Sequence, residues 1–333
     1  MKHCIFRGVL VLTFLTELFR KKLSSLENEQ MQQVCGPYKK VMRNKVIFGT
    51  KTESKEAPWA VPIAVYRYEG VLHCTATLVS SRHIITARHC FVRDFEHGSF
   101  RYVFNGEVIN KDNCRGEDYI VPPERSEADI HFATRCRDEE TCENINLPTN
   151  LITRKPALVV LPGLCSGNVL TYLNQDDIAI VELDKDVLFS EKIHPICIDF
   201  DGYSSNYFEN ITIYDFGFDL QPINAYFEGD SGGGGIMERN GRTTLVAVLS
   251  RGEACGEHKR DKADLHMSVW YYSKVICKYT GICKINGDSP KREFDVKQLY
   301  GQEIAKPKLI SFGQHIQISF WIIFNFLCVL LLS

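Results

Sequence analysis

Short runs of β-branched residues mark the first strands that this chain predicts. Such residues make up most of Thr75–Val79 and His83–Thr86, and the polar turn Ser80-Ser81-Arg82 separates the two runs. This arrangement predicts a pair of short strands. Along Trp270–Tyr279 the apolar residues instead recur with the period of a helix. One face of that helix would carry Tyr272, Val275, Ile276 and Tyr279.

The two ends of the chain are apolar. Lys2 and Arg7 precede an apolar run at Gly8–Leu15, so we expect residues 1–24 to be a signal peptide, with a signal anchor as the alternative. Residues 309–333 contain no Asp, Glu, Lys or Arg. This hydrophobic tail is expected to be a removable lipid-anchor signal or a spanning helix, and either implies membrane association. The polar residues 284–308 would then form a stalk.

Composition favours the secretory pathway. The 333 residues carry a formal net charge of −2 at pH 7, which gives no bias towards nucleic acid. Thirteen cysteines suggest an oxidising compartment. Asn210-Ile211-Thr212 is a glycosylation sequon. We therefore expect an extracellular or cell-surface protein with a sugar at Asn210.

Three motifs carry the candidate chemistry. They are Thr86-Ala87-Arg88-His89-Cys90, Asp177–Leu183 and Gly229-Asp230-Ser231-Gly232-Gly233. Each motif alone has a simpler interpretation: a structural or metal-binding histidine, an aspartate that opens a strand, and a flexible turn. Together and in this order they supply an imidazole, a carboxylate and a hydroxyl, the groups that activate a serine for acyl transfer. A glycine-rich turn also lets backbone N–H groups point at the developing oxyanion, and this chemistry needs no cofactor.

These motifs resemble those of the chymotrypsin/trypsin-like serine peptidases, and more closely their divergent nematode trypsin-like branch. The likeness runs from about Cys35 to Cys283 and includes Pro58-Trp59-Ala60-Val61 and Pro195-Ile196-Cys197. It implies an all-β fold of two antiparallel barrels of the six-stranded type with a short C-terminal helix. The peptidase domain would occupy residues 46–283.

The resemblance also assigns roles to single residues. His89 would be the general base and acid, Asp177 its orienting carboxylate and Ser231 the nucleophile. The amides of Gly229 and Ser231 would form the oxyanion hole, and Ser250 would hydrogen-bond the triad carboxylate.

Activation is implied in the same way. Residues 25–45 would be a propeptide, and an activating protease would cut after Lys45. The new amino group of Val46 would then pair with Asp230 and order the nucleophile turn.

Most cysteines have an expected partner. The resemblance pairs Cys74 with Cys90 and Cys35 with Cys197, and Cys277 and Cys283 are close enough in sequence to close a small loop. Four more are expected to pair among themselves: Cys114, Cys136, Cys142 and Cys165. The resemblance implies a cysteine at position 227 as the partner of Cys255, but Phe227 stands there. We therefore expect Cys255 to be a free thiol or to bind another chain. A metal site is the alternative for such a cluster, but the sequence lacks Cys-x-x-Cys and His-x-x-x-His spacing.

The chain departs from the resembling family in two lengths. The interval from His89 to Asp177 is long, and its surplus at 91–170 is expected to project from the first barrel as a neutral surface insert, with an exosite as the alternative. Ser231 follows Gly217 closely, so the second barrel looks shortened. This shortening is either genuine or the mark of a missing exon. Its strand candidates are Thr212–Phe216, Gly235–Met237, Thr243–Ser250 and Leu265–Val269.

The specificity pocket is consequently left open. Ala225 stands at the expected floor, where it offers no charge. Asp264 could supply a negative charge for a basic substrate side chain, or be an ordinary solvated aspartate. Gly252 belongs to the expected wall strand.

The sequence therefore predicts a trypsin-like serine endopeptidase that hydrolyses protein or peptide substrates. The alternative is a catalytically impaired pseudopeptidase that acts as an extracellular binding or decoy module. A structural surface glycoprotein is a third possibility. An active-site serine probe distinguishes the enzyme from the other two.

Overall fold

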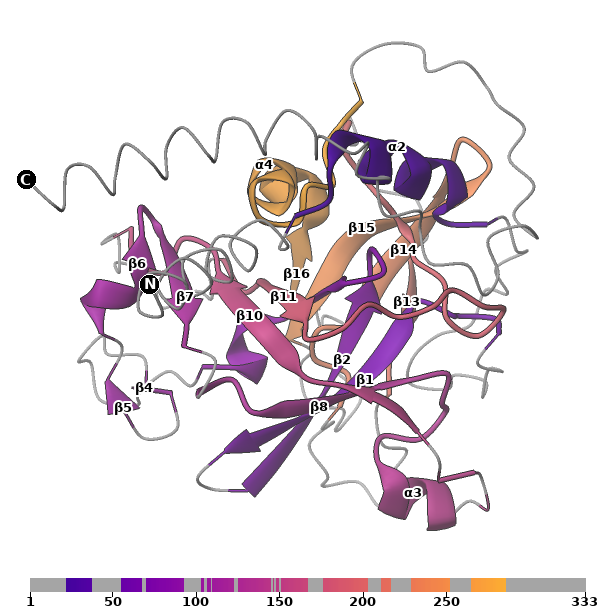
Figure 1. Ribbon diagram of the computed structural model, residues 1–333, viewed down its shortest axis with the longest axis horizontal. Coiled ribbons are helices and arrows are strands. Elements are labelled where there is room, and N and C mark those ends of the chain that lie inside the picture. Colours follow the sequence, from indigo (N-terminus) through magenta and orange to yellow (C-terminus); the bar gives the residue numbers. More distant parts are fainter. Residues whose placement is uncertain are drawn as a thin grey trace, which may run out of the picture.

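The strands of this protein form two main sheets (Figure 1). The computed structural model describes residues 22–37, 55–67, 70–92, 103–104, 107–108, 110–122, 125–144, 146, 148–149, 151–166, 176–202, 211–216, 229–251 and 265–285. Their strand pairing is almost wholly antiparallel. The fold is the expected all-β, trypsin-like one with a short C-terminal helix.

The first sheet has nine strands in the order β6-β7-β10-β11-β3-β2-β1-β8-β9. The predicted hairpin around Ser80-Ser81-Arg82 is present as β2 and β3. A separate ladder joins β4 to β5. The bounds in chain order are β1 Ala60–Arg67, β2 Gly70–Leu78, β3 His83–Thr86, β4 Val103–Phe104, β5 Glu107–Val108, β6 Cys114–Arg115, β7 Asp118–Val121, β8 Ala128–Phe132, β9 Ile152–Arg154, β10 Pro156–Leu161 and β11 Ala179–Leu183.

The sequence predicts that the long segment at 91–170 projects from the first barrel. In the structure, strands of this segment instead form part of the sheet. Strand β8 pairs with β1, and β10 pairs with both β7 and β11. The inward side chains of these strands are apolar, and Tyr119, Ile130 and Leu161 are almost completely buried. Each buried side chain of this size contributes about 1.5–3 kcal/mol. The segment therefore folds with the barrel because its inward residues complete the core.

The second sheet follows the order β12-β15-β14-β13, and β16 pairs with β15 on the edge that β12 occupies, further along the strand. All four predicted strands are present with slightly different ends, and β12 is added, parallel to β15. The Trp59 ring packs edge-on against Tyr214 with centroids 5.9 Å apart, which connects the two sheets. The bounds are β12 Cys197–Ile198, β13 Thr212–Tyr214, β14 Gly234–Arg239, β15 Arg242–Arg251 and β16 Leu265–Ser268.

Helix α2 (Ser25–Val34) precedes the first strand and packs onto the C-terminal part of the domain. Ser24 and Glu27 form a capping box, in which each side chain accepts the other's backbone N–H. The Asn28 amide donates to the Cys283 carbonyl at 2.9 Å and accepts from the Cys283 N–H at 3.2 Å. Part of the expected propeptide is thus a helix docked on the folded domain.

Helix α4 (Val269–Thr280) extends the predicted helix by one residue at each end. Gly281 ends it with a φ of 76°, and its N–H donates to the Cys277 carbonyl at 3.0 Å. Tyr272 and Ile276 on the predicted apolar face are buried. α2 and α4 lie on the same side of the molecule (Figure 1), joined through a hydrogen bond from the Leu23 N–H to the Thr280 carbonyl.

Five disulfides join the described parts of the fold. The three individual pairings expected from the sequence are formed, and the four cysteines of the long segment pair among themselves as Cys114–Cys165 and Cys136–Cys142. The bonds are Cys35–Cys197, Cys74–Cys90, Cys114–Cys165, Cys136–Cys142 and Cys277–Cys283.

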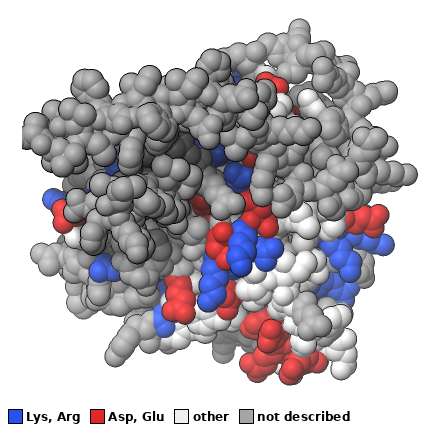
Figure 2. Space-filling view, viewed as in Figure 1, with Lys and Arg blue, Asp and Glu red and all other residues white. Residues whose placement is uncertain are grey.

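Charges are mixed on the face shown in Figure 2. Lys and Arg side chains lie among Asp and Glu side chains, and acidic ones gather over α3 (Glu139–Asn144). In the described part of the chain, no helix is both long enough and apolar enough to cross a membrane. The expected signal segment, stalk and hydrophobic tail (residues 1–24, 284–308 and 309–333) lie wholly or almost wholly outside the described residues.

Candidate active site

His89 lies just beyond the end of β3, in a short 3₁₀ turn, Arg88–Cys90. The four residues of β3 are buried, so the strand fixes the start of this turn. The bond from Cys90 to Cys74 on β2 fixes its end. The His89 side chain keeps 38 % of its surface exposed, so a substrate could reach it.

Asp177 lies two residues before the start of β11, the neighbour of β3. The pairing of Ala179 with Thr86 brings the beginning of β11 beside the His89 turn. One oxygen of the Asp177 carboxylate accepts the His89 backbone N–H at 2.8 Å, and the other lies 2.8 Å from His89 Nδ1. Because an ionised carboxylate can only accept, Nδ1 carries the proton and Nε2 is left as an acceptor.

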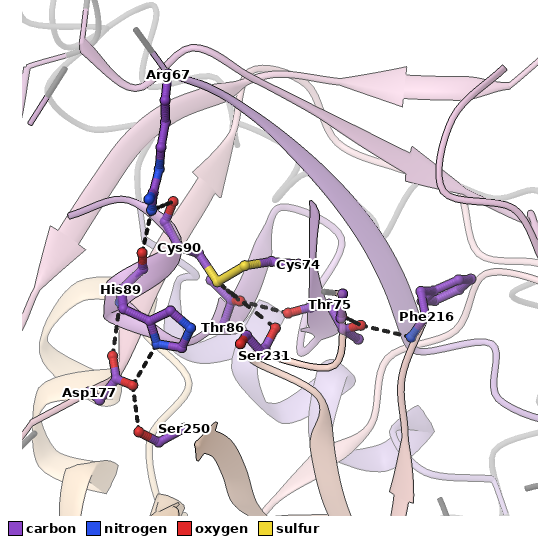
Figure 3. The surroundings of a disulfide bond; sticks show 11 residues. Arg67, Cys74, Thr75, Thr86, His89, Cys90, Asp177, Phe216, Ser231 and Ser250 are labelled. Carbon is purple, nitrogen blue, oxygen red and sulfur yellow. Dashed lines mark hydrogen bonds and ion pairs between the residues drawn. A yellow bond between two sulfur atoms is a disulfide. The ribbon is translucent and has the colours of Figure 1, made fainter. Parts of the chain in front are cut away.

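Ser250 supports the same carboxylate from the second sheet. Its hydroxyl donates to Asp177 Oδ2 at 2.6 Å. Asp177 is 1 % exposed, and burial alone would raise the pKa of its carboxyl group. Hydrogen bonds from His89 and Ser250 stabilise the charged form and hold that pKa below its ordinary value. Asp177 is therefore a buried anion with a full set of donors (Figure 3).

Ser231 lies in a turn that both sheets hold in place. The Thr75 N–H donates to the Ser231 carbonyl at 2.8 Å, and the Thr75 hydroxyl donates to the Gly229 carbonyl at 2.7 Å. On the other side, the Gly232 N–H donates to the Leu249 carbonyl at 2.8 Å. The nucleophile turn is thus bound to β2 on one side and to β15 on the other.

Glycine is required at position 232 for two reasons. Its φ is +84°, a conformation that L side chains rarely adopt. A Cβ there would also lie 2.1 Å from the Thr86 hydroxyl oxygen and 2.3 Å from the Thr75 carbonyl oxygen. The turn therefore packs its backbone directly against β2 and β3.

The imidazole stands between Asp177 and the part of the site that holds Ser231 (Figure 3). The described contacts of His89 and Ser231 include no hydrogen bond between the two side chains. Such bonds are often long in the absence of substrate. Among the described residues, the N–H groups of Gly229 and Ser231 also donate to no other group, whereas those of Gly232 and Gly233 are in use.

Several residues singled out from the sequence lie outside the described part of the chain. The described Asp230 accepts the Gly233 N–H at its carbonyl, 2.9 Å away, but its expected partner lies outside. The undescribed candidates are Lys45, Val46, Asn210, Ala225, Phe227, Gly252, Cys255 and Asp264.

Two groups around the histidine turn were not expected from the sequence. The Arg67 guanidinium at the end of β1 donates to the His89 carbonyl and, at 2.7 Å, to the Cys90 carbonyl. The Thr86 hydroxyl donates to the Thr75 carbonyl at 2.6 Å. Thr86 belongs to a quoted motif, but Arg67 has no local signal because only strand register brings it near. Among the described residues, the candidate ligand atoms of Cys74, His89 and Cys90 lie close enough together to hold a metal ion. The two sulfurs, however, are bonded to each other in a disulfide.

Comparison with known proteins also indicates the trypsin-like serine proteases. A model of the nematode trypsin-6-like family matches residues 5–283. CLIP domain-containing serine protease B15 of Anopheles gambiae is 29 % identical over 172 residues, which is 50 % of this chain and 38 % of that protein. Transmembrane protease serine 11A of Homo sapiens is 25 % identical over 277 residues, which is 78 % of this chain and 61 % of that protein. The chain thus spans less than two thirds of the length of these relatives.

Proposed function

Because the chain belongs to the nematode trypsin-6-like family of trypsin-like serine proteases, we propose that it is a serine endopeptidase acting on protein or peptide substrates. His89 is the general base and acid, Asp177 orients it and Ser231 is the nucleophile. The observation that carries the proposal is the buried Asp177 carboxylate, which accepts from both the backbone and the ring of His89. A buried charge with this set of donors fixes the tautomer that a general base needs.

The proposed reaction passes through an acyl-enzyme. His89 Nε2 takes the Ser231 hydroxyl proton while Ser231 Oγ bonds to the substrate carbonyl carbon. The oxyanion receives hydrogen bonds from the Gly229 and Ser231 N–H groups, which donate to no other described group. The imidazolium then gives its proton to the leaving amine as the peptide C–N bond breaks. Water, activated by the same imidazole, hydrolyses the ester and restores Ser231.

Activation by proteolysis is part of the proposal. A protease that cuts after Lys45 would free the Val46 ammonium to pair with Asp230, and this pair would order the Gly229–Ser231 turn. The Cys35–Cys197 disulfide would keep the N-terminal piece attached after the cut.

Location and specificity also belong to the proposal. Five disulfides support an oxidising compartment, and we propose secretion or attachment to the cell surface, with the tail at 309–333 as the membrane contact and a sugar at Asn210. Asp264 is the candidate charge for a basic substrate side chain, and Ala225 and Gly252 are the other pocket candidates.

A fluorophosphonate probe tests the function, because it reports serine activation without a known substrate. Protein cut after Lys45 should be labelled at Ser231, and Ser231→Ala should abolish the labelling. His89→Ala should lower the rate by several orders of magnitude, because the members of a triad act as a unit. Lys45→Gln should give an uncleaved, unlabelled protein. The matched control is Ser166→Ala, which removes an exposed serine hydroxyl and should label normally.

The same experiment distinguishes the enzyme from the alternative, a pseudopeptidase. A pseudopeptidase that acts by binding would be folded and correctly cut, yet would not be labelled at Ser231. That result would reject the enzyme.

A further inference from the structure

The residue before the triad aspartate is held in an unusual backbone conformation. Asp176 has a φ of +65°, in the left-handed region that few residues other than glycine adopt. The Ile178 N–H donates to the Asp176 carbonyl at 2.7 Å, which makes Asp177 the centre of a tight turn. The direction of the Asp177 side chain therefore depends on how firmly Asp176 is held.

A tyrosine of helix α4 holds Asp176. The Tyr272 hydroxyl donates to Asp176 Oδ1 at 2.7 Å, and Tyr272 is 7 % exposed. On the other side, Gly163 leaves room for the Asp176 carboxylate, because a Cβ at Gly163 would lie 2.6 Å from Asp176 Oδ2. The carboxylate is thus enclosed between a hydroxyl donor and a glycine backbone.

The electrostatics keep the phenol in the donor form. Burial, followed by the hydrogen bond and the charge of Asp176, raises the pKa of Tyr272 far above its ordinary value. The positive charge of Arg88 opposes this rise in part. Arg88 directly precedes His89, and Asp176 directly precedes Asp177. The Tyr272 phenol thus interacts electrostatically with the neighbours of two triad residues.

Helix α4 does not need this bond in order to stay docked. Its other end is held to β7 by Asp118, whose carboxylate accepts from Lys278 Nζ at 2.6 Å and from the Tyr279 hydroxyl at 2.7 Å. The buried Ile276 and the Cys277–Cys283 bond hold it as well. Loss of the Tyr272 hydroxyl alone should therefore leave the helix in place.

We propose that Tyr272 is a positioning residue for the triad: its hydroxyl fixes Asp176 in the left-handed conformation and thereby aims Asp177 at His89. This inference rests on the proposed function. Without the hydroxyl, Asp176 loses the partner that fixes its strained conformation, and the Asp177 carboxylate spends less time in line with His89 Nδ1.

The test compares Tyr272→Phe with Tyr271→Phe. Tyr271 is the neighbouring residue, is 69 % exposed and packs against Tyr272 through its ring. Its variant removes a hydroxyl that makes no hydrogen bond to a described residue. Tyr272→Phe should lower the fluorophosphonate labelling rate about tenfold or more, the scale of one hydrogen bond to a charged group, while Tyr271→Phe labels normally.

Variants at Asp176 supply the rescue. Asp176→Ala should lower the rate at least as much as Tyr272→Phe, because it removes the same contact and also places alanine at a positive φ. Adding Tyr272→Phe to Asp176→Ala should lower the rate no further, because the contact is already lost. Asp176→Asn keeps an acceptor for the hydroxyl and tolerates a positive φ, so it should retain most of the rate.

A second measurement does not depend on catalysis. The proton on His89 Nδ1 gives a low-field NMR signal, assigned by its loss in His89→Ala, that reports the bond to Asp177. Tyr272→Phe should shift or weaken this signal, and Tyr271→Phe should not. If the signal and the labelling rate both survive Tyr272→Phe, the positioning role is wrong although the peptidase stands. If the wild type is not labelled at all, the proposed function fails and the NMR signal alone decides about Tyr272.

Discussion

Replacing Ser250 with alanine measures how much one buried hydroxyl contributes to the charge on Asp177. The hydroxyl donates to Asp177 Oδ2 at 2.6 Å, and both residues are at most 2 % exposed. Hydrogen bonds to charged groups contribute about 1.5–3 kcal/mol, and bonds between neutral groups about 0.5–1.5 kcal/mol. Ser250→Ala should therefore cost about 1.5–3 kcal/mol while Asp177 is ionised, and about 1 kcal/mol less once it is protonated.

The sign of the pH dependence follows from the lowered pKa of Asp177. That pKa lies below its ordinary value of 3.8 in the folded protein. The ionised group therefore contributes stability that is fully present above about pH 4 and is lost as the pH falls through the folded pKa. The destabilisation caused by Ser250→Ala should shrink on acidification for the same reason.

Urea unfolding from pH 7 down to pH 2 is the assay, with both proteins carrying Ser231→Ala to prevent self-digestion. Thr280→Val is the control, because the buried Thr280 hydroxyl donates to the Ile276 carbonyl and accepts the Ile282 N–H, neither of which titrates. Its cost should stay constant over this range. A Ser250→Ala cost that is equally constant would refute the assignment of this hydroxyl to the carboxylate.

Two further predictions concern packing. Gly232→Ala should abolish labelling and lower the free energy of unfolding by several kcal/mol, because its Cβ would lie 2.1–2.3 Å from atoms of Thr86 and Thr75. The control is Gly241→Ala, at a φ of +72° with nothing within 4 Å of the new Cβ. It should cost only about 1 kcal/mol in thermal unfolding. Asn28→Ala should cost about 1–3 kcal/mol, because the Cys283 N–H loses its described acceptor, while the Cys283 carbonyl keeps the Gln32 amide as a donor. An effect no larger than that of the exposed Glu29→Ala in the same urea assay would contradict the role of Asn28 in docking α2 on the C-terminal segment.

Local features of the fold were predictable from the sequence, and distant contacts were not. The β2–β3 hairpin and helix α4 have their signals within a few residues. The capping box of α2, Ser24 with Glu27, is likewise a local signal, whereas its docking on the Cys283 segment depends on a distant contact. The segment at 91–170 was interpreted from its length, which says nothing about strand register, and register is what places β8 and β10 in the sheet.

The candidate site divides in the same way. The three motifs could be located because each needs a fixed local pattern around one reactive group. The donors Arg67 and Tyr272 could not, since a single arginine at a strand end or tyrosine on a helix has no pattern that names its partner. Their roles arise only when β1 lies beside the His89 turn and α4 lies beside Asp176.

The anchoring of the nucleophile turn limits what a shortened second barrel could damage. Thr75 binds the Ser231 and Gly229 carbonyls from the first sheet, and Leu249 binds the Gly232 N–H from β15. These contacts use none of the residues between Gly217 and the turn. The position of Ser231 therefore depends on the meeting of the two sheets, and a change in length before it bears first on the substrate pocket. A peptidase with this turn would keep an activatable serine while its substrate preference drifts, which is why a fluorophosphonate probe, blind to that preference, is the appropriate first experiment.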